Sequence, residues 1–232
     1  EDRVFGLRKH LHALHKENQK LKVAVTGCMV RKTSTQINEE NRDHILDVMS
    51  EVDFTVRLEE VAKIPDLIKE LNPKIKFADS IDDGTLENYF KISPKKTSNF
   101  SVFVPVSTGC DKYCTYCIVP YSRGREVSRD FDEILAECKK HVAEAAIEIT
   151  LVGQTVNSYG LSFNDKKSGK FADYGKSPFA ALLKEIDKLH EKGLKRLRFT
   201  SPHRRDFFDK LIETMRGLKT ICPYIHMPVQ SG

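Results

Sequence analysis

Three cysteines lie close together in the run Ser107-Thr-Gly-Cys-Asp-Lys-Tyr-Cys-Thr-Tyr-Cys-Ile-Val-Pro120, and they are the residues best suited to chemistry. Cys110, Cys114 and Cys117 have the spacing C-x₃-C-x₂-C, so one short loop can bring three thiolates to one metal centre. Thiolates are the ligands that iron–sulfur clusters select, and ferredoxin-type clusters take four of them. A loop with three thiolates therefore leaves one iron open to a small molecule, much as catalytic zinc keeps an open position.

A structural zinc site and a thioredoxin-like redox pair are the alternative interpretations of this loop. Zinc needs a fourth ligand, and no nearby histidine provides one at a familiar spacing. A redox pair would leave Cys110 without a role. The iron–sulfur cluster is therefore the favoured interpretation.

The loop resembles the signature of the radical S-adenosylmethionine (SAM) enzymes, C-x₃-C-x-aromatic-C, with Tyr116 at the aromatic position. Longer segments resemble the methylthiotransferases, and within them the branch that thiomethylates isopentenylated adenosine in tRNA. These segments are residues 117–129 (CIVPYSRGREVSR), 151–154 (LVGQ), 199–203 (FTSPH) and 227–232 (MPVQSG). The resemblance covers nearly the whole chain.

The resemblance implies a 4Fe–4S cluster whose open iron chelates SAM, with a second SAM molecule as the methyl donor. It also implies that Cys28 is one ligand of an auxiliary 4Fe–4S cluster, whose other two cysteines are absent from this chain. On its own, a lone cysteine after a strand is more often a small buried side chain. This chain alone is therefore not expected to complete the reaction.

The resemblance and the strand ends together suggest four residues that contact SAM. Tyr116 is expected beside the adenine, with ordinary loop packing as the alternative. Gly153 and Gln154 follow a strand, where a backbone or amide group can bind the SAM amino group, although a plain turn glycine would look the same. Gln230 is expected at the end of a later strand. The family usually has Asn or Asp where this chain has Thr155, and no catalytic residue is assigned.

The implied partners are tRNA, at its anticodon loop, and an electron donor such as flavodoxin or ferredoxin. A single-stranded loop allows a base to be splayed into a pocket. Two alternatives remain open: a methylthiotransferase that modifies a ribosomal protein, and a non-catalytic, zinc-bound nucleic-acid-binding module. Analysis for iron and sulfide against zinc separates the last from the others.

Hydrophobic periodicity predicts the elements that position the site. Residues 1–72 alternate helices and strands, which predicts a small parallel α/β N-terminal domain, incomplete at its start. Residues 73–99 are polar, contain Pro and Gly, and are predicted to be a linker. The helices of this first part are expected at 2–19, 41–49 and 65–71, and its strands at 21–26 and 52–56.

Residues 100–232 are predicted to form the first part of a radical SAM (β/α) barrel, left incomplete by this chain. The strands are expected at 100–104, 147–152, 194–200 and 222–229, and the helices at 130–142, 178–193 and 206–216. Sites in such barrels lie at the carboxyl ends of the strands. The cysteine loop, Gly153 and Gln154, residues 201–203 and residues 230–231 all follow predicted strands, so one rim is expected to carry the site.

The composition is that of a globular protein in a reducing compartment. Hydrophobic residues make up 40% of the chain, the net charge is +5, and no stretch is apolar for long enough to cross a bilayer. Six irregularly spaced cysteines do not resemble a disulfide framework, so a cytoplasmic location is expected. The chain begins without Met and stops after a predicted strand, which suggests an internal fragment.

Overall fold

The computed structural model describes residues 2–36, 42–74, 98 and 100–227. The chain divides into two compact units, one of Glu1–Ile92 with Tyr121–Arg123 and one of Ser93–Pro120 with Gly124–Gly232. Most of the predicted linker lies outside the described residues. Among the helices that are described, none combines the length and the apolar character needed to cross a membrane.

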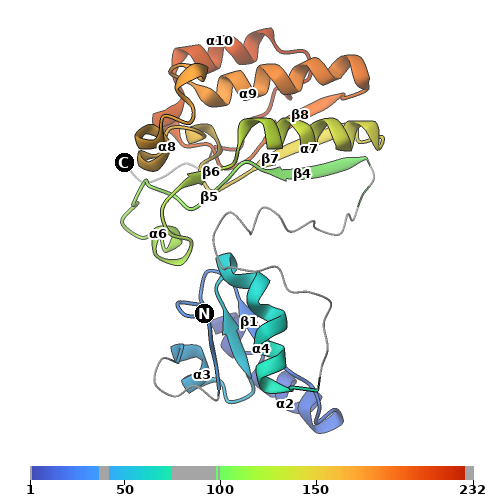
Figure 1. Cartoon of the computed structure of the whole chain (residues 1–232), viewed down its shortest axis with the longest axis vertical. Helices are drawn as coiled ribbons and strands as arrows, with labels where there is room; N and C mark the ends of the chain where they lie inside the picture. The colour runs from blue at the N-terminus through green and yellow to red at the C-terminus, as the bar shows by residue number, and fades with distance from the viewer. Residues whose placement is uncertain (1, 37–41, 75–97, 99, 228–232) are drawn as a thin grey trace. The chain divides into compact units, whose positions relative to one another are not determined.

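The N-terminal unit is built on a small three-stranded sheet (Figure 1). β1 (Ala24–Thr26) and β3 (Phe54–Val56) pair in parallel, which confirms the predicted arrangement. β2 (Ser34–Thr35) adds an antiparallel strand beside β3 that the sequence did not predict. Two polar residues carry no hydrophobic period, so this strand has no signal of its own.

Helices complete the N-terminal unit and cover its small core. The helix predicted at 2–19 is two helices, α1 (Asp2–Phe5) and α2 (Arg8–Glu17), separated at Gly6, a poor helix former. The chain continues through α3 (His44–Val48), the 3₁₀ helix η1 (Leu58–Lys63) and α4 (Ile64–Leu71). The buried core of this unit consists of Val30, Ile45, Leu46, Met49 and Val52.

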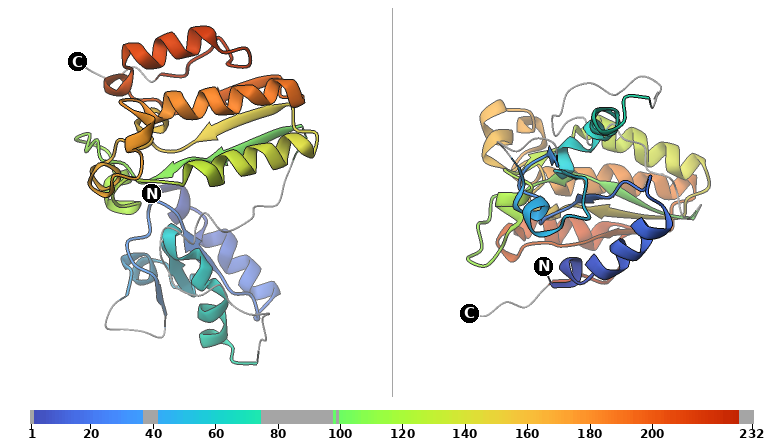
Figure 2. Two further views of the ribbon diagram at one scale, coloured as in Figure 1. Left: turned by 45° about the horizontal axis from the view of Figure 1, so that its top comes forward. Right: turned by 90° about the horizontal axis from the view of Figure 1, so that it is seen from below.

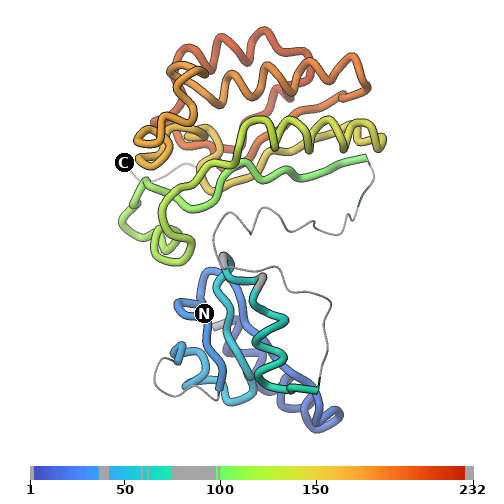
Figure 3. Tube along the Cα trace, viewed as in Figure 1, coloured from blue at the N-terminus to red at the C-terminus, as the bar shows by residue number. Residues whose placement is uncertain are grey.

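The C-terminal unit contains a parallel sheet in the order β4-β7-β8. Its strands are β4 (Ser101–Pro105), β7 (Glu148–Val152) and β8 (Arg196–Phe199). The helices α7 (Phe131–Ala143), α9 (Pro178–Asp187) and α10 (Asp209–Gly217) follow the successive strands and lie on one face of the sheet (Figures 1 and 2). The Cα trace shows the three strand–helix units stacked side by side (Figure 3). This is the repeated unit of a (β/α) barrel, as predicted.

Burial of apolar side chains between this sheet and its helices provides the main stabilisation of the unit. Ile149 and Leu151 of β7 are fully buried, as are Leu182 and Ile186 of α9. Each such side chain contributes about 1.5–3 kcal/mol relative to an exposed position. On the opposite face of β4, Phe103 is 65% exposed. The described part of the sheet is thus covered by helices on one face only.

The helix boundaries agree with their capping residues. The side chain of Asp130 accepts hydrogen bonds from the first backbone N–H groups of α7, and Ser177 caps α9 in the same way. The 3₁₀ helix η4 (Lys188–Lys192) extends α9 to Gly193, which adopts the left-handed conformation with φ 111°. These three residues were the predicted start and stop signals.

The fourth predicted strand, at 222–229, is not formed in residues 222–227, and the remaining residues lie outside the described ranges. The chain makes a single parallel bridge instead, between Ile221 and Leu197. Pro223 explains the interruption, because it has no N–H to donate to a strand ladder. The prediction that Cys222 lies within a strand is therefore wrong.

The segments after β4 and β7 are longer than simple turns. After β4 comes a two-stranded antiparallel hairpin, β5 (Ser107–Thr108) and β6 (Val127–Ser128), with α6 (Val119–Ser122) in its loop. After β7 come η2 (Val156–Ser158), α8 (Phe163–Ser168) and η3 (Ala172–Tyr174), and η5 (Arg204–Asp206) follows β8. All of these leave the carboxyl ends of parallel strands, where barrels carry their sites.

Candidate functional site

The cysteine loop begins at a close contact between the two arms of the β5–β6 hairpin. Gly109 has φ +76°, and a Cβ atom there would lie 2.2 Å from the Arg125 carbonyl oxygen. The N–H of Cys110 donates to the Gly124 carbonyl oxygen at 3.3 Å. Only glycine can occupy position 109 with this backbone, and it holds Cys110 at the base of the hairpin.

The three cysteines differ in their exposure. Cys110 is buried, Cys117 is half-buried and Cys114 is exposed, and all three are free thiols. The N–H of Cys117 donates to the Cys114 carbonyl oxygen at 2.9 Å, which makes a turn between them. Tyr113, next to Cys114, has φ 48°, which a non-glycine residue rarely adopts. The tip of the loop therefore carries two accessible thiols on a strained backbone.

The donor set of this loop fits an iron–sulfur cluster in its chemistry. Three thiols are available within one loop, and thiolate sulfur is the ligand that such clusters select. Among the described residues, no three His, Cys, Asp or Glu side chains are already gathered closely enough to hold a metal ion. The assignment of Cys110, Cys114 and Cys117 as ligands thus stays a prediction.

Thr155 connects the cysteine loop to the end of β7. Its hydroxyl lies 3.1 Å from the Cys110 sulfur, and both side chains are buried. Burial raises the pKa of the Cys110 thiol, so without a metal this thiol stays protonated at neutral pH. The residue that departs from the usual pattern of the resembled family is thus in direct contact with a predicted ligand.

A buried carboxyl group lies beneath the loop. Glu126 is 1% exposed and accepts a hydrogen bond from the Ser158 hydroxyl of η2. Its backbone N–H donates to the Asp111 carboxylate at 3.1 Å. Burial raises the pKa of Glu126 to about 7, because the charged form is poorly solvated there. Glu126 ties the hairpin to the segment after β7.

Two further contacts join the segments after β7 and β8. The side-chain amide of Asn157 donates to the His203 carbonyl oxygen at 2.8 Å and accepts from the His203 N–H at 2.7 Å. Lys112 of the cysteine loop forms an ion pair with Asp206 of η5 at 2.6 Å. The structure therefore brings the cysteine loop and the ends of β7 and β8 to one rim, as the sequence predicted.

The predicted SAM contacts have different surroundings. Gly153 sits against β5, where a Cβ atom would lie 2.7 Å from the Ser107 hydroxyl oxygen. The side-chain oxygen of Gln154 is buried and has no hydrogen-bond partner among the described residues. Tyr116 is 73% exposed. An unpartnered acceptor beside the cysteine loop is what a ligand with an amino group would satisfy.

The other two predicted site residues lie elsewhere. Gln230 is outside the described residues. Cys28 belongs to the N-terminal unit, where it follows β1 and Gly27 and is half-buried. Its role as a ligand of an auxiliary cluster stays a prediction.

The sequence analysis did not identify Glu126, Asn157 or Ser158 as site residues. Asn157 and Ser158 are only 1% and 2% exposed, which is unusual for polar residues in a loop. A signal was present, because polar residues continue directly after the Gly153 turn of a buried strand. Their partners on other loops could be found only in the folded chain.

Comparison with known proteins agrees with this geometry. Residues 104–232, more than half of the chain, match the family described as the Radical SAM superfamily. The tRNA-2-methylthio-N(6)-dimethylallyladenosine synthase of Parafrankia sp. (strain EAN1pec) is 37% identical over 232 residues, which are 100% of this chain and 43% of that protein. The proteins of the same name from Dictyoglomus thermophilum (strain ATCC 35947 / DSM 3960 / H-6-12) and Mycolicibacterium paratuberculosis (strain ATCC BAA-968 / K-10) are each 33% identical over the whole chain, which covers 48% and 42% of them.

The chain thus spans less than half the length of these curated relatives. The family match begins in β4 and includes the cysteine loop, the buried contacts around it and the ends of β7 and β8. With this match, the chain belongs to the radical SAM superfamily of enzymes.

Proposed function

We propose that the protein is a tRNA methylthiotransferase that adds a methylthio group to isopentenylated adenosine next to the anticodon. The observation that carries this proposal is the similarity along all 232 residues to proteins named tRNA-2-methylthio-N(6)-dimethylallyladenosine synthase. The cysteine loop at the rim of a parallel sheet supports it, because the radical chemistry of this family needs such a loop.

The radical SAM superfamily implies a 4Fe–4S cluster and SAM as cofactors. We assign Cys110, Cys114 and Cys117 as the cluster ligands. When bound, cluster and SAM together supply a 5′-deoxyadenosyl radical that removes hydrogen from the target base. The buried end of the loop around Cys110 and Thr155 would exclude water from that chemistry.

The residues around the loop have positioning roles in this proposal. Gln154 would accept a hydrogen bond from the SAM amino group through its unpartnered side-chain oxygen, with Gly153 leaving room beside β5. Tyr116 would cover the adenine, and Gln230 would add a further contact. Glu126 and Asn157 would hold the loops in place through the contacts described above.

The wider organisation is part of the same proposal. Residues 1–72 would be an incomplete N-terminal domain that supplies Cys28 to an auxiliary 4Fe–4S cluster, 73–99 a linker, and 100–232 a partial barrel. The protein would work in the cytoplasm and receive electrons from a flavodoxin or ferredoxin. Iron with acid-labile sulfide, and not stoichiometric zinc, is expected in the purified protein.

Deletion of the gene is expected to remove the methylthio mark from tRNA and to leave isopentenylated adenosine in its place. The measurement is nucleoside mass spectrometry of total tRNA, with the intact gene returned as the control. A methylthio mark that persists in tRNA while a ribosomal protein loses one would assign the protein to the other methylthiotransferase branch.

Replacement of Thr155 by valine is expected to make the 4Fe–4S cluster harder to reduce. A cluster thiolate can only accept a hydrogen bond, so Thr155 would donate to Cys110, and such bonds stabilise the more negative reduced state. The midpoint potential, followed by electron paramagnetic resonance, should become more negative in Thr155→Val. Thr155→Ser keeps the hydroxyl and should stay near the wild-type potential. Equal potentials in the two variants would exclude this role.

A further inference from the structure

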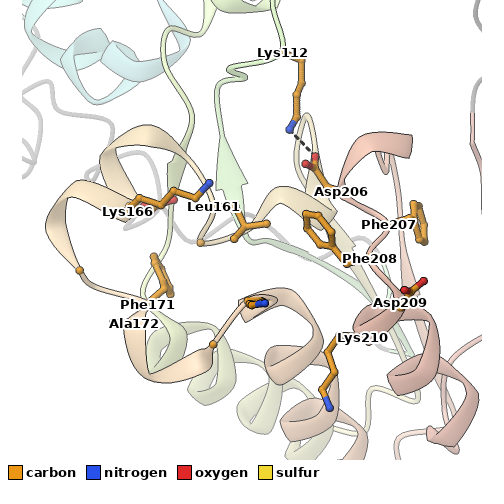
Figure 4. A pocket seen from close by; sticks show the side chains of 15 residues that line it. Lys112, Leu161, Lys166, Phe171, Ala172, Asp206, Phe207, Phe208, Asp209 and Lys210 are labelled. Atoms are coloured by element: carbon orange, nitrogen blue, oxygen red, sulfur yellow. Dashed lines mark ion pairs between the residues drawn. The ribbon is translucent and has the colours of Figure 1, made fainter.

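An open pocket of about 1020 Å³ lies in the C-terminal unit between the segment after β7 and the start of α10 (Figure 4). Residues 160–176 form one wall and residues 206–210 the other. Both walls follow the carboxyl ends of parallel strands, so the pocket belongs to the rim that carries the cysteine loop. Cys110, Gly153 and Gln154 do not line it, so it is distinct from the predicted SAM contacts.

Two of the acidic side chains that line the pocket already have partners. Asp206 pairs with Lys112, 2.6 Å away, as the dashed line in Figure 4 marks. Asp165 is buried and accepts a hydrogen bond from the Ser128 hydroxyl at 2.8 Å. These two carboxylates therefore contribute little negative charge to a ligand in the pocket.

Three lysines that line the pocket are exposed and have no ion-pair partner among the described residues. Lys166 and Lys176 come from the wall that follows β7, and Lys210 comes from α10. Asp209 is the acidic side chain that remains against them. The resulting excess of positive charge favours an anionic ligand.

Aromatic side chains line the same pocket. Phe208 is 43% exposed, and Figure 4 shows its ring beside Leu161. Phe171 is buried and contributes to the wall below α8. Exposed aromatic rings next to lysines are typical of sites for single-stranded nucleic acid, where bases stack on the rings and phosphates meet the cations.

We propose that this pocket binds one nucleotide of the RNA that flanks the target adenosine. Its phosphate would lie against Lys166, Lys176 and Lys210, and its base would stack on the Phe208 ring. This inference rests on the proposed function, because it takes RNA as the substrate. The volume supports a polymer segment, since it reaches the upper end of the roughly 300–1,000 Å³ found for small-molecule sites.

The test measures binding of the protein, as its gene encodes it, to a fluorescent anticodon stem-loop RNA that contains isopentenylated adenosine. The pocket variant is Lys166→Glu/Lys176→Glu/Lys210→Glu. The matched control is Lys139→Glu/Lys184→Glu/Lys192→Glu, which makes the same change in net charge at exposed lysines of α7, α9 and η4. Anisotropy is recorded from roughly 50 to 200 mM salt, a range in which phosphate contacts weaken binding steeply.

The pocket variant is expected to bind RNA at least tenfold more weakly than the control variant. Each lost phosphate contact lowers the slope of log K against log salt by about 0.7 for single strands, so three contacts lower it by about 2. Phe208→Ala should weaken binding by about fivefold to 100-fold, as expected for one stacked base, while Phe208→Tyr should keep the affinity. Thermal melting of each variant checks that the fold is intact.

The outcomes separate the pocket from the proposed function. Wild-type protein that binds the RNA, together with equal affinities of the pocket and control variants, would overturn the pocket and leave the function standing. Wild-type protein that does not bind the RNA would overturn both. If AMP binds and the pocket variant loses only AMP, the pocket is a mononucleotide site and the RNA assignment is wrong.

Discussion

A Cys114→Ala variant, reconstituted anaerobically with iron and sulfide, is expected to lack the radical SAM cluster and to cleave no SAM. The loop offers three thiols and the cluster would use all of them, so no spare ligand can replace the lost one. Loss even of a side chain that only supports a ligand costs about 10–100-fold in metal affinity or activity, and loss of the ligand should exceed that range. Cys114 is exposed, so the substitution removes little packing.

The readouts are iron and sulfide content, and the electron paramagnetic resonance spectrum of the reduced protein with and without SAM. In the wild-type protein the spectrum should change when SAM is added, because SAM would bind the open iron. Cys222→Ala is the matched control, since Cys222 is also a half-buried free thiol of the C-terminal unit but lies outside the loop. Stoichiometric zinc in the wild type, or equal iron in Cys114→Ala and Cys222→Ala, would contradict the assignment.

Gly109→Ala is expected to disrupt the base of the cysteine loop. A Cβ atom at position 109 would lie 2.2 Å from the Arg125 carbonyl oxygen, and φ at this residue is +76°. Left-handed strain and overpacking together should lower the free energy of unfolding by about 2–5 kcal/mol and displace Cys110 from its place in the hairpin. Iron incorporation should fall with it.

Gly169→Ala provides the control for the conformational part of this effect. Gly169 has a similar φ of +69°, but nothing lies within 4 Å of a Cβ atom there. Its substitution should cost only the left-handed strain, about 1–2 kcal/mol, and should leave the iron content unchanged. Denaturant titration and iron analysis of the two variants make the comparison. If both variants lose the same stability and keep the same iron, the close contact at Gly109 is unimportant.

Local sequence signals predicted most of the regular structure. Asp130, Ser177 and Gly193 lie at the helix ends where their capping chemistry placed them. The apolar strands of the C-terminal unit were also correct, because buried parallel strands are short, continuous apolar runs. The strand at 222–229 was the failure, since its apolar pattern ignored the missing N–H of Pro223.

The sequence by itself determined the cysteine loop, the order of strands and helices, and the rim on which the site residues gather. Those features depend on spacing and periodicity, which are local. Only the tertiary structure decided that Thr155 contacts Cys110, that Glu126 is buried against Ser158, and that Asn157 holds His203. Each of these pairs joins loops 32 to 46 residues apart. Contacts of that kind follow from how the strands align in the sheet, and no local pattern of residues encodes them.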